Sequence, residues 1–216
     1  MEQERFEASP SEGASSVAWG SLADTLDMLA QMMNTVPDER WTPSLIDAVG
    51  TLDEAAPGCA RMKRYLAEHA ADPLEDVVRD LAVDWTLAFR GTNPALGPKP
   101  PYAGAWLADD GTGVQMMLTI NSCYVEAGLK SSGNHLNRYD YLGVELEFLA
   151  HLMRMIDGDD AHDAAERIVD FEDRYILSWL PRYCEHVEQR CKTEFWKGYL
   201  ELVLAVLSDI RDFLAK

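Results

Sequence analysis

Apolar residues recur at steps of three and four along most of the chain, which is the spacing that gathers side chains on one face of an α-helix. The clearest stripes lie in residues 17–36, 139–156 and 194–215. In the last stripe the apolar positions are Trp196, Leu200, Val203, Leu207, Ile210 and Leu214. No segment alternates apolar and polar residues over the length of a strand. The pattern therefore predicts an all-α fold, a single helical domain of roughly nine to ten helices.

Cap and turn residues divide the rest of the chain into further helices. We expect Thr42 to cap one helix with Pro43 in its first turn, and Asp72 to cap another with Pro73 in its first turn. The helix after Asp72 would bury a stripe made of Leu74, Val78, Leu81, Trp85 and Ala88 or Phe89. The same pattern predicts helices over residues 59–70, 113–127, 160–180 and 182–191.

A proline-rich segment interrupts the helical pattern near the middle of the chain. Gly91 ends the preceding stripe in the position of a helix C-cap. Four prolines then oppose a new helix start: Pro94, Pro98, Pro100 and Pro101. We therefore expect a connector over residues 91–103 that joins two helical halves of one domain, residues 17–216. Residues 1–16 are polar and acidic and are expected to form a disordered tail.

The charge balance narrows the class of partner. The net charge is −18, from 37 acidic and 19 basic residues, which argues against nucleic-acid binding and is compatible with a basic partner. No apolar run reaches the ~18–20 residues of a membrane span, and the N-terminus lacks the basic start and apolar core of a secretory signal. We expect a cytoplasmic protein without stable membrane insertion, whose four cysteines, none in a CxxC pair, stay reduced.

Enzymatic motifs are scarce. The chain contains neither a GxxxxGK phosphate loop nor a GxSxG elbow. Glu147 with His151, and His162 with Glu166, are four residues apart and could each chelate a metal, although solvated contacts between neighbouring helix turns explain them equally well. We expect no catalytic residue, no metal and no cofactor. A metal-dependent helical hydrolase that uses these four side chains remains the alternative from another class.

Three short motifs follow one another around the connector. The first is an aromatic residue followed, after a short gap, by a hydrophobic pair, here Trp85 to Phe89 with Ala88 in place of a leucine. The second is a Pro-Pro-aromatic sequence with a second aromatic close behind: Pro100, Pro101, Tyr102 and then Trp106-Leu107. The third is Asp140-Tyr141-Leu142-Gly143 with Glu145 shortly after.

In order and spacing these motifs resemble the TorD/DmsD family of cytoplasmic chaperones for molybdenum-containing redox enzymes. The departures from the family pattern are Ala88 for leucine, Gly104 where a serine is common, and Tyr141 for histidine. The resemblance implies a protein that binds the twin-arginine signal peptide and the apo catalytic subunit of a molybdoenzyme. It would support cofactor insertion and prevent premature export. A nitrate-reductase-type assembly chaperone, whose client has no functional export signal, is the close alternative.

The resemblance also implies a peptide-binding site at the motifs. The apolar part of the peptide would lie against Trp85, Phe89, Pro100, Pro101, Tyr102 and Trp106. Asp140 and Glu145, on either side of Tyr141, would pair with arginine guanidinium groups. Glu145 is expected on the helix surface, whereas Trp85 also fits the core stripe, so core packing is its competing interpretation.

Two further expectations follow from this site. Replacing both Asp140 and Glu145 by alanine should weaken peptide binding and leave folding intact, because exposed charges matter little for stability. The connector is a plausible hinge for a domain-swapped dimer, and a monomer is equally admissible.

Overall fold

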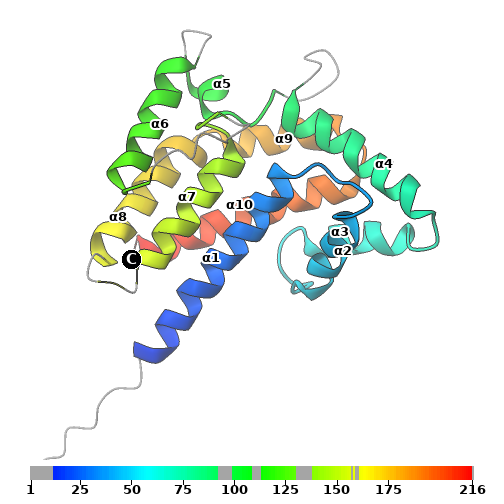
Figure 1. Cartoon of the computed structure of the whole chain (residues 1–216), viewed down its shortest axis with the longest axis horizontal. Coiled ribbons are helices and arrows are strands. Elements are labelled where there is room, and N and C mark those ends of the chain that lie inside the picture. Colours follow the sequence, from blue (N-terminus) through cyan, green and yellow to red (C-terminus); the bar gives the residue numbers. More distant parts are fainter. Residues whose placement is uncertain are drawn as a thin grey trace, which may run out of the picture.

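The computed structural model describes residues 12–91, 99–108, 113–129, 138–156, 158 and 161–215, with side chains from Trp19 onward within these ranges. These residues form ten α-helices and two π-helical segments, which follow one another from blue to red in Figure 1. Their bounds are α1 (Glu12–Asn34), α2 (Thr42–Thr51), α3 (Cys59–Glu68), α4 (Leu74–Trp85), η1 (Thr86–Arg90), α5 (Ala103–Leu107), α6 (Val114–Glu126), α7 (Leu142–Met155), α8 (Ala161–Phe171), η2 (Glu172–Ile176), α9 (Leu180–Arg190) and α10 (Glu194–Leu214).

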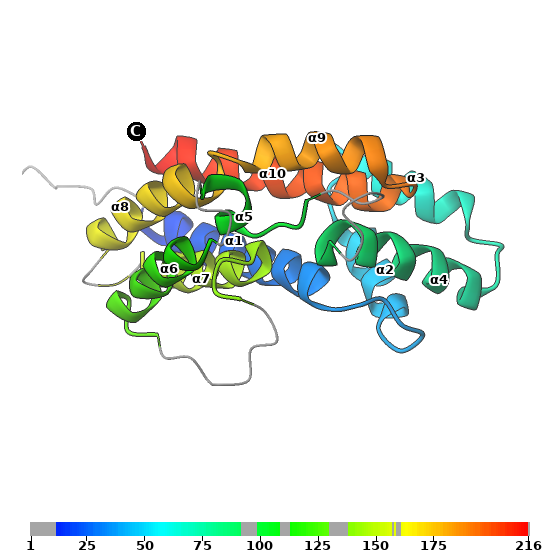
Figure 2. The same cartoon turned by 90° about the horizontal axis from the view of Figure 1, so that it is seen from above.

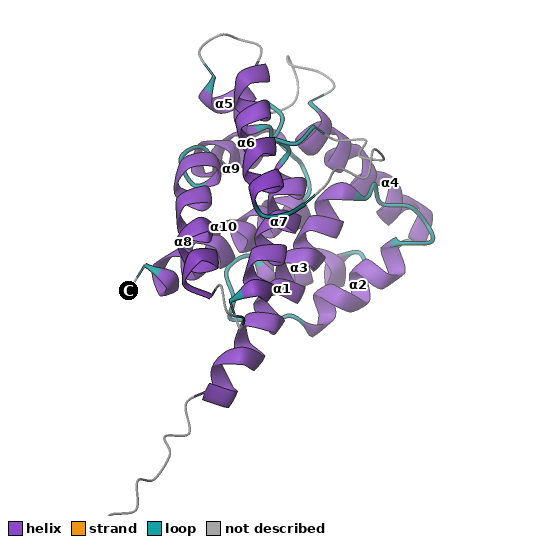
Figure 3. Cartoon of the chain, turned by 60° about the vertical axis from the view of Figure 1, so that its left-hand side comes forward, coloured by secondary structure: helices purple, strands orange, loops and turns teal. Residues whose placement is uncertain are grey.

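The all-α prediction and the single helical domain are confirmed. Figure 3 shows no strand in the described residues, where β-type pairing is limited to an isolated antiparallel bridge between Tyr102 and Tyr141. None of the described helices is both long and apolar enough to cross a membrane. Residues 92–98, the greater part of the expected connector, lie outside the described residues, so the connector stays a prediction.

Helix α1 packs along α7, and α10 crosses α3 on the other side of the molecule. Seen from above, α9 and α10 lie along one side and α6 and α7 along the other, with α1 between them (Figure 2). Helix α7 is enclosed by this arrangement, since ten of its 14 residues are buried. A helix that is covered on almost every side must bury whatever polar side chains it carries.

The C-terminal end of α1 is the meeting point of the core. The last carbonyls of any helix have no partner within that helix and need donors from elsewhere. Three fully buried aromatic side chains, from α4, from the residue that precedes α7 and from α10, donate to carbonyls in the last two turns of α1. They are Trp85 Nε1 to Met32 (3.2 Å), Tyr141 OH to Met33 (2.9 Å) and Tyr199 OH to Leu29 (2.6 Å).

The crossing of α3 and α10 depends on two glycines. Gly58 has a positive φ of 77°, and its carbonyl lies against Gly198 of α10. A Cβ atom at Gly198 would lie 2.6 Å from the oxygen of Gly58, closer than any side chain tolerates. Only glycine lets the two backbones touch here.

An ion cluster reinforces the same crossing. The guanidinium of Arg61 on α3 pairs with Glu188 of α9 (2.9 Å) and with Glu194 and Glu201 of α10 (2.5 Å each). The hydrogen bond from Arg61 lowers the pKa of Glu194 to about 2. One cation thereby ties α3 to both C-terminal helices.

Several predicted helix boundaries are wrong for identifiable reasons. Helix α1 begins at Glu12, so the expected tail boundary at Ser16 lies inside it, and residues 1–11 lie outside the described residues. Thr42 is not a cap: Asp38 Oδ1 accepts the N–H groups of Arg40 (3.0 Å) and Trp41 (2.7 Å), and the buried Thr42 hydroxyl has no partner among the residues that the structure describes.

The stripe after Asp72 is also shifted. Helix α4 begins at Leu74, and Asp72 pairs with His69 (2.7 Å) instead of capping the helix. Leu74 is 42% exposed, and Val77 takes the buried position in the first turns. The prediction for Leu81, Trp85, Ala88 and Phe89 is confirmed, because all four are buried.

One buried carboxylate joins α4 to the start of α10. Asp84 is 2% exposed, and its Oδ2 accepts the backbone N–H groups of Lys192 (2.7 Å) and Thr193 (2.5 Å). Thr193, the residue that precedes α10, makes no capping bond with its own side chain. Asp84 therefore caps α10 from a distant helix and neutralises the positive end of its dipole.

We expect Asp84→Ala to lower the free energy of unfolding by about 2–3 kcal/mol, because two buried N–H groups lose a charged acceptor. Urea denaturation followed by circular dichroism measures the change. Asp80→Ala, an exposed aspartate one turn earlier on α4, should change stability by about 0.5 kcal/mol or less. Equal effects of the two substitutions would contradict the capping role.

Candidate functional site

The second and third sequence motifs meet at one place, which we call the connector junction: residues 99–108 and 138–145. The Ala103 N–H donates to the Asp140 carbonyl (2.8 Å), and the Leu142 N–H donates to the Pro101 carbonyl (3.0 Å). These two bonds form the bridge between Tyr102 and Tyr141. Segments almost 40 residues apart in sequence thus share a backbone contact just before α5 and α7 begin.

Asp140 lies at the centre of the junction and is fully buried. Its Oδ1 accepts Arg138 Nε (2.9 Å), and its Oδ2 accepts Arg138 Nη2 (2.9 Å) and the Gly104 N–H (3.0 Å). A Cβ at Gly104 would lie 2.7 Å from this oxygen, which explains why glycine stands at this position. Asp140 precedes α7 and does not lie in its first turns as expected. Its carboxylate is already bound by an arginine of the same chain.

Glu145 is not on the helix surface, contrary to the expectation from its position. It is fully buried in α7, and neither carboxyl oxygen has a hydrogen-bond partner among the described residues. Burial raises the pKa of Glu145 well above the ordinary value, and the nearby charge of Asp140 raises it further. Because Glu145 is fully enclosed in the core, it does not offer a surface charge to a peptide arginine.

The aromatic residues of the first motif belong to the core. Trp85 and Phe89 are 1% and 0% exposed, and Phe89 packs edge-on against the rings of Trp196 (5.2 Å) and Tyr199 (5.9 Å). Tyr141 is also fully buried by its bond to α1. Core packing is thus the correct interpretation for Trp85, and the structure does not bring these three side chains into a groove.

Trp106 forms a second aromatic cluster at the edge of the junction. Its ring stacks on Trp179 (5.9 Å, 18° between planes), and its Nε1 donates to the Pro100 carbonyl (3.0 Å). Pro101 and Trp106 are buried, with Trp106 9% exposed, whereas Pro100 and Tyr102 are half-buried. Of the nine predicted site residues, only Pro100 and Tyr102 therefore present substantial surface.

The surface of the junction is basic although the chain is acidic. Four cations lie over aromatic rings in or beside it: Arg90 over Trp85 (4.7 Å) and Tyr141 (5.6 Å), Lys99 and Arg182 over Trp106 (5.2 and 5.5 Å), and Arg138 over Tyr102 (5.4 Å). Cations bind the faces of aromatic rings through the ring quadrupole. A pair of peptide arginines would meet like charges here, so the junction suits an apolar segment better than a basic one.

The metal-site alternative finds no support in the described part of the chain. His162 pairs only with Glu166 (3.2 Å) on the exposed side of α8, and Glu147 accepts a hydrogen bond from Asn34 (2.7 Å). No group of three or more His, Cys, Asp or Glu side chains in the described ranges is placed to hold a metal ion. The four proposed hydrolase side chains thus do not converge there.

Two contributors to the junction were missed by sequence reasoning. Arg138 is the ionic partner of Asp140, and its position two residues before that aspartate was the available signal. Asn34 of α1 packs against Gly143, where a Cβ would collide with its side-chain oxygen. That contact joins residues 109 positions apart and leaves no local signal in the sequence.

The chain is similar to several known proteins. Residues 52–185 match the family described as the nitrate reductase delta subunit. A chaperone protein TorD from Aliivibrio fischeri is 25% identical over 179 residues, covering 81% of this chain and 77% of the relative. TorD chaperones from Shigella boydii and Escherichia coli O8 are 26% identical over 136 residues, and the match spans 63% of their length. A proposed redox enzyme maturation protein from Archaeoglobus fulgidus, known from a crystal structure, aligns over all of both chains with 20% identity and a TM-score of 0.49.

The family match and the relatives named TorD define the class as that of redox enzyme maturation chaperones. The chain belongs to the nitrate reductase delta subunit family, which confirms the resemblance to the TorD/DmsD group.

Asp140 and Glu145 are both buried, which contradicts the premise of exposed charges behind the expectation that replacing both by alanine leaves folding intact. We expect Asp140→Ala to lower the free energy of unfolding by about 2–3 kcal/mol, because the Gly104 N–H and the Arg138 guanidinium lose their acceptor. Chemical denaturation measures this directly. Asp163→Ala, which breaks the exposed pair with Arg167, should cost about 1 kcal/mol or less. Full stability of the Asp140 variant would refute the structural role.

Glu145 makes stability depend on pH. Its folded-state pKa is raised, so above the ordinary value of 4.5 the folded state keeps a proton that the unfolded state has lost. Stability therefore falls as pH rises through the window between these two pKa values. Glu145→Gln removes this titration, and its melting temperature relative to wild type should rise by about 2–4 °C or more from pH 5 to pH 8. Glu75→Gln, at an exposed site, should give the same difference at both pH values.

Proposed function

We propose that the protein is a cytoplasmic maturation chaperone that binds the twin-arginine signal peptide and the apo catalytic subunit of a molybdenum-containing oxidoreductase. It holds the client until the cofactor is inserted and so prevents premature export. Family membership, together with relatives that carry the name TorD, is the observation that carries the proposal. Monomer and domain-swapped dimer both remain predictions.

The connector junction supports an apolar contact with such a peptide. Pro100 and Tyr102 are half-buried, and the backbone beside them is held by the bonds to Asp140 and Leu142. Proline and tyrosine offer apolar area with little side-chain freedom to lose. A surface that is already ordered binds varied apolar sequences at low entropic cost, which is what a signal peptide requires.

The arginine pair of the peptide needs carboxylates outside the junction. Asp140 is occupied by Arg138, and Glu145 is fully enclosed in the core. The overall charge of −18 still favours association with a basic peptide, because opposite net charges raise the rate of encounter. The apolar part of the peptide and its arginine pair therefore contact different places on the protein surface.

A nitrate-reductase-type assembly chaperone is the second candidate, and the family match favours it directly. In that case the client segment is an N-terminal stretch of a subunit without a functional export signal. The same half-buried aromatic surface would receive it, and only the client differs.

We expect isothermal titration of the purified protein with twin-arginine signal peptides of redox enzymes to give dissociation constants of about 1–10 μM or tighter. Replacing both arginines by alanine should weaken binding roughly tenfold or more, because each charge-assisted hydrogen bond contributes about 1.5–3 kcal/mol.

The matched control is the same peptide with both arginines replaced by citrulline, which keeps the shape and removes the charge. Binding to N-terminal peptides of nitrate reductase subunits alone would select the second candidate. Failure to bind any peptide of either kind would exclude both.

A further inference from the structure

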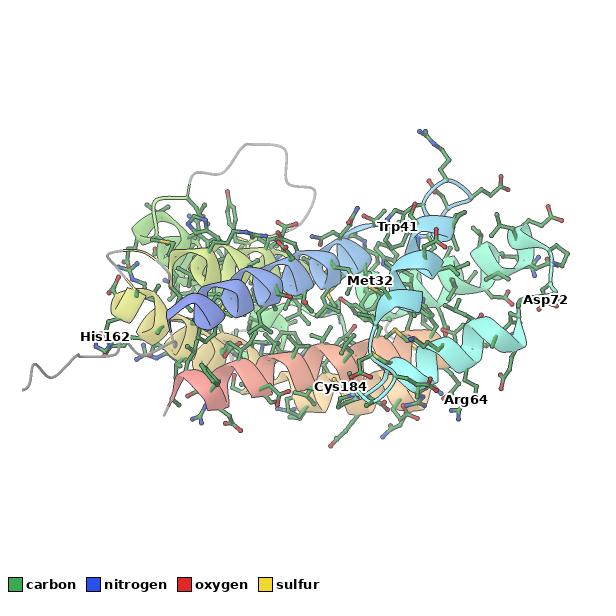
Figure 4. The ribbon with its side chains drawn as sticks, turned by 90° about the horizontal axis from the view of Figure 1, so that it is seen from below. Met32, Trp41, Arg64, Asp72, His162 and Cys184 are labelled. Carbon is green, nitrogen blue, oxygen red and sulfur yellow. The ribbon has the colours of Figure 1, made fainter. Side chains whose placement is uncertain are left out.

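A cavity of about 350 Å³ lies where α3, α4 and the start of α10 meet, and we call it the α10 cavity. None of its lining residues belongs to the connector junction. Its walls include Tyr65 of α3, Asp80, Val83 and Asp84 of α4, and Thr193. Asp72, which Figure 4 labels at one end of the molecule, lies in the turn between α3 and α4, opposite the end marked by His162.

The inner wall of the α10 cavity carries hydrogen-bond acceptors that the fold leaves unused. Thr193 is 7% exposed, and its hydroxyl has no hydrogen-bond partner among the described residues. Tyr65 is 6% exposed, and its hydroxyl likewise bonds to none of them. Asp84 uses only Oδ2 to cap α10, which leaves Oδ1 available. Of these groups, the Thr193 hydroxyl is a buried atom without a partner in the described residues, and its burial costs free energy unless a ligand satisfies it.

The electrostatic environment of the α10 cavity favours a cation. Burial raises the pKa of Tyr65 to about 12, and the carboxylates of Asp80, Asp84 and Asp72 raise it further in that order. The positive end of α10 is already neutralised by Asp84. Of the two cations that border the cavity, Arg79 is held by Asp76 (2.6 Å) and Asp80 (3.4 Å), and Lys192 is solvent-exposed.

A guanidinium group matches this set of acceptors. It carries five N–H donors in a planar fork and accepts no hydrogen bond, so it satisfies several acceptors at once. It also stacks on aromatic rings, and here the ring of Tyr65 lies 4.5 Å from that of His69. The volume is at the low end for ligand pockets, which suits a single side chain and not a folded segment.

We propose that the α10 cavity receives an arginine guanidinium of the bound basic peptide. This assignment rests on the proposed function and supplies the carboxylates that the connector junction lacks. Val83, which is 60% exposed and lines the cavity, offers an apolar contact for the residue next to that arginine. The peptide is thereby anchored by its charge at α4 and by its apolar part elsewhere on the surface.

The cavity is tested first without any peptide. Nuclear magnetic resonance titration of the full chain uses N-acetyl-arginine amide, with N-acetyl-citrulline amide as its neutral isostere. The arginine probe should shift the amide signals of Tyr65, Asp84 and Thr193. The citrulline probe should bind with an affinity at least about tenfold lower. Equal shifts with both probes, or shifts confined to other regions, would overturn the assignment.

The second arm uses the variant Tyr65→Phe/Thr193→Val, which removes two hydroxyls and keeps the shape of the cavity. Its affinity for the twin-arginine peptide should fall about fivefold or more, with thermal stability unchanged or raised because the Thr193 hydroxyl is unpaired. The control Tyr175→Phe/Thr119→Val removes the same groups on η2 and α6, away from both the cavity and the connector junction, and its affinity should not change.

The outcomes separate this inference from the proposed function. Tight peptide binding that both double variants retain would leave the chaperone proposal standing and refute the cavity assignment. Arginine-probe binding in the α10 cavity of a protein that binds no signal peptide would support the cavity as a guanidinium site and refute the proposed client.

Discussion

The hydrogen bonds from Trp85, Tyr141 and Tyr199 to the end of α1 hold the core together. The donors come from α4, from the residue that precedes α7 and from α10, and each acceptor is a carbonyl in the last two turns of α1. An aromatic ring with one polar atom supplies both the apolar area that a core needs and the donor that a buried helix end lacks. The motif aromatics are consequently engaged inside the molecule, and the helices that carry them cannot rotate without leaving a carbonyl unpaired in the interior.

Because these aromatic side chains are bonded inside the molecule, few of the motif residues reach the surface. The side chains that the family motif marks act mostly from within: Trp85 bonds α4 to α1, Tyr141 bonds the start of α7 to α1, and Asp140 holds the start of α5 through the Gly104 N–H. The groups that reach solvent are the half-buried Pro100 and Tyr102 and the cations that lie over the aromatic rings. Tyr141, which stands where the family pattern has a histidine, also acts inside the molecule. Its hydroxyl donates to the Met33 carbonyl, and its ring lies in the core.

Periodicity alone located almost every helix, because a stripe of apolar residues has to face the interior. It missed α5, which is only five residues long and follows two prolines. The burial of Glu145 could not be read from polarity, since a carboxylate at a helix surface is the ordinary case. The face that it shares with Tyr141, Phe148 and Leu152 was visible in the sequence, but the number of neighbours covering α7 was not. Long-range bonds such as those of Asp84 and Asn34 depend on the fold as a whole.

The contact between Gly58 and Gly198 fixes the register of α10. A slide of α10 by one residue, about 1.5 Å along its axis, would bring Lys197 or Tyr199 to the point where only a hydrogen atom fits. The backbone contact itself therefore sets how far α10 lies along α3, and the ion pairs of Arg61 hold a register that the two glycines define.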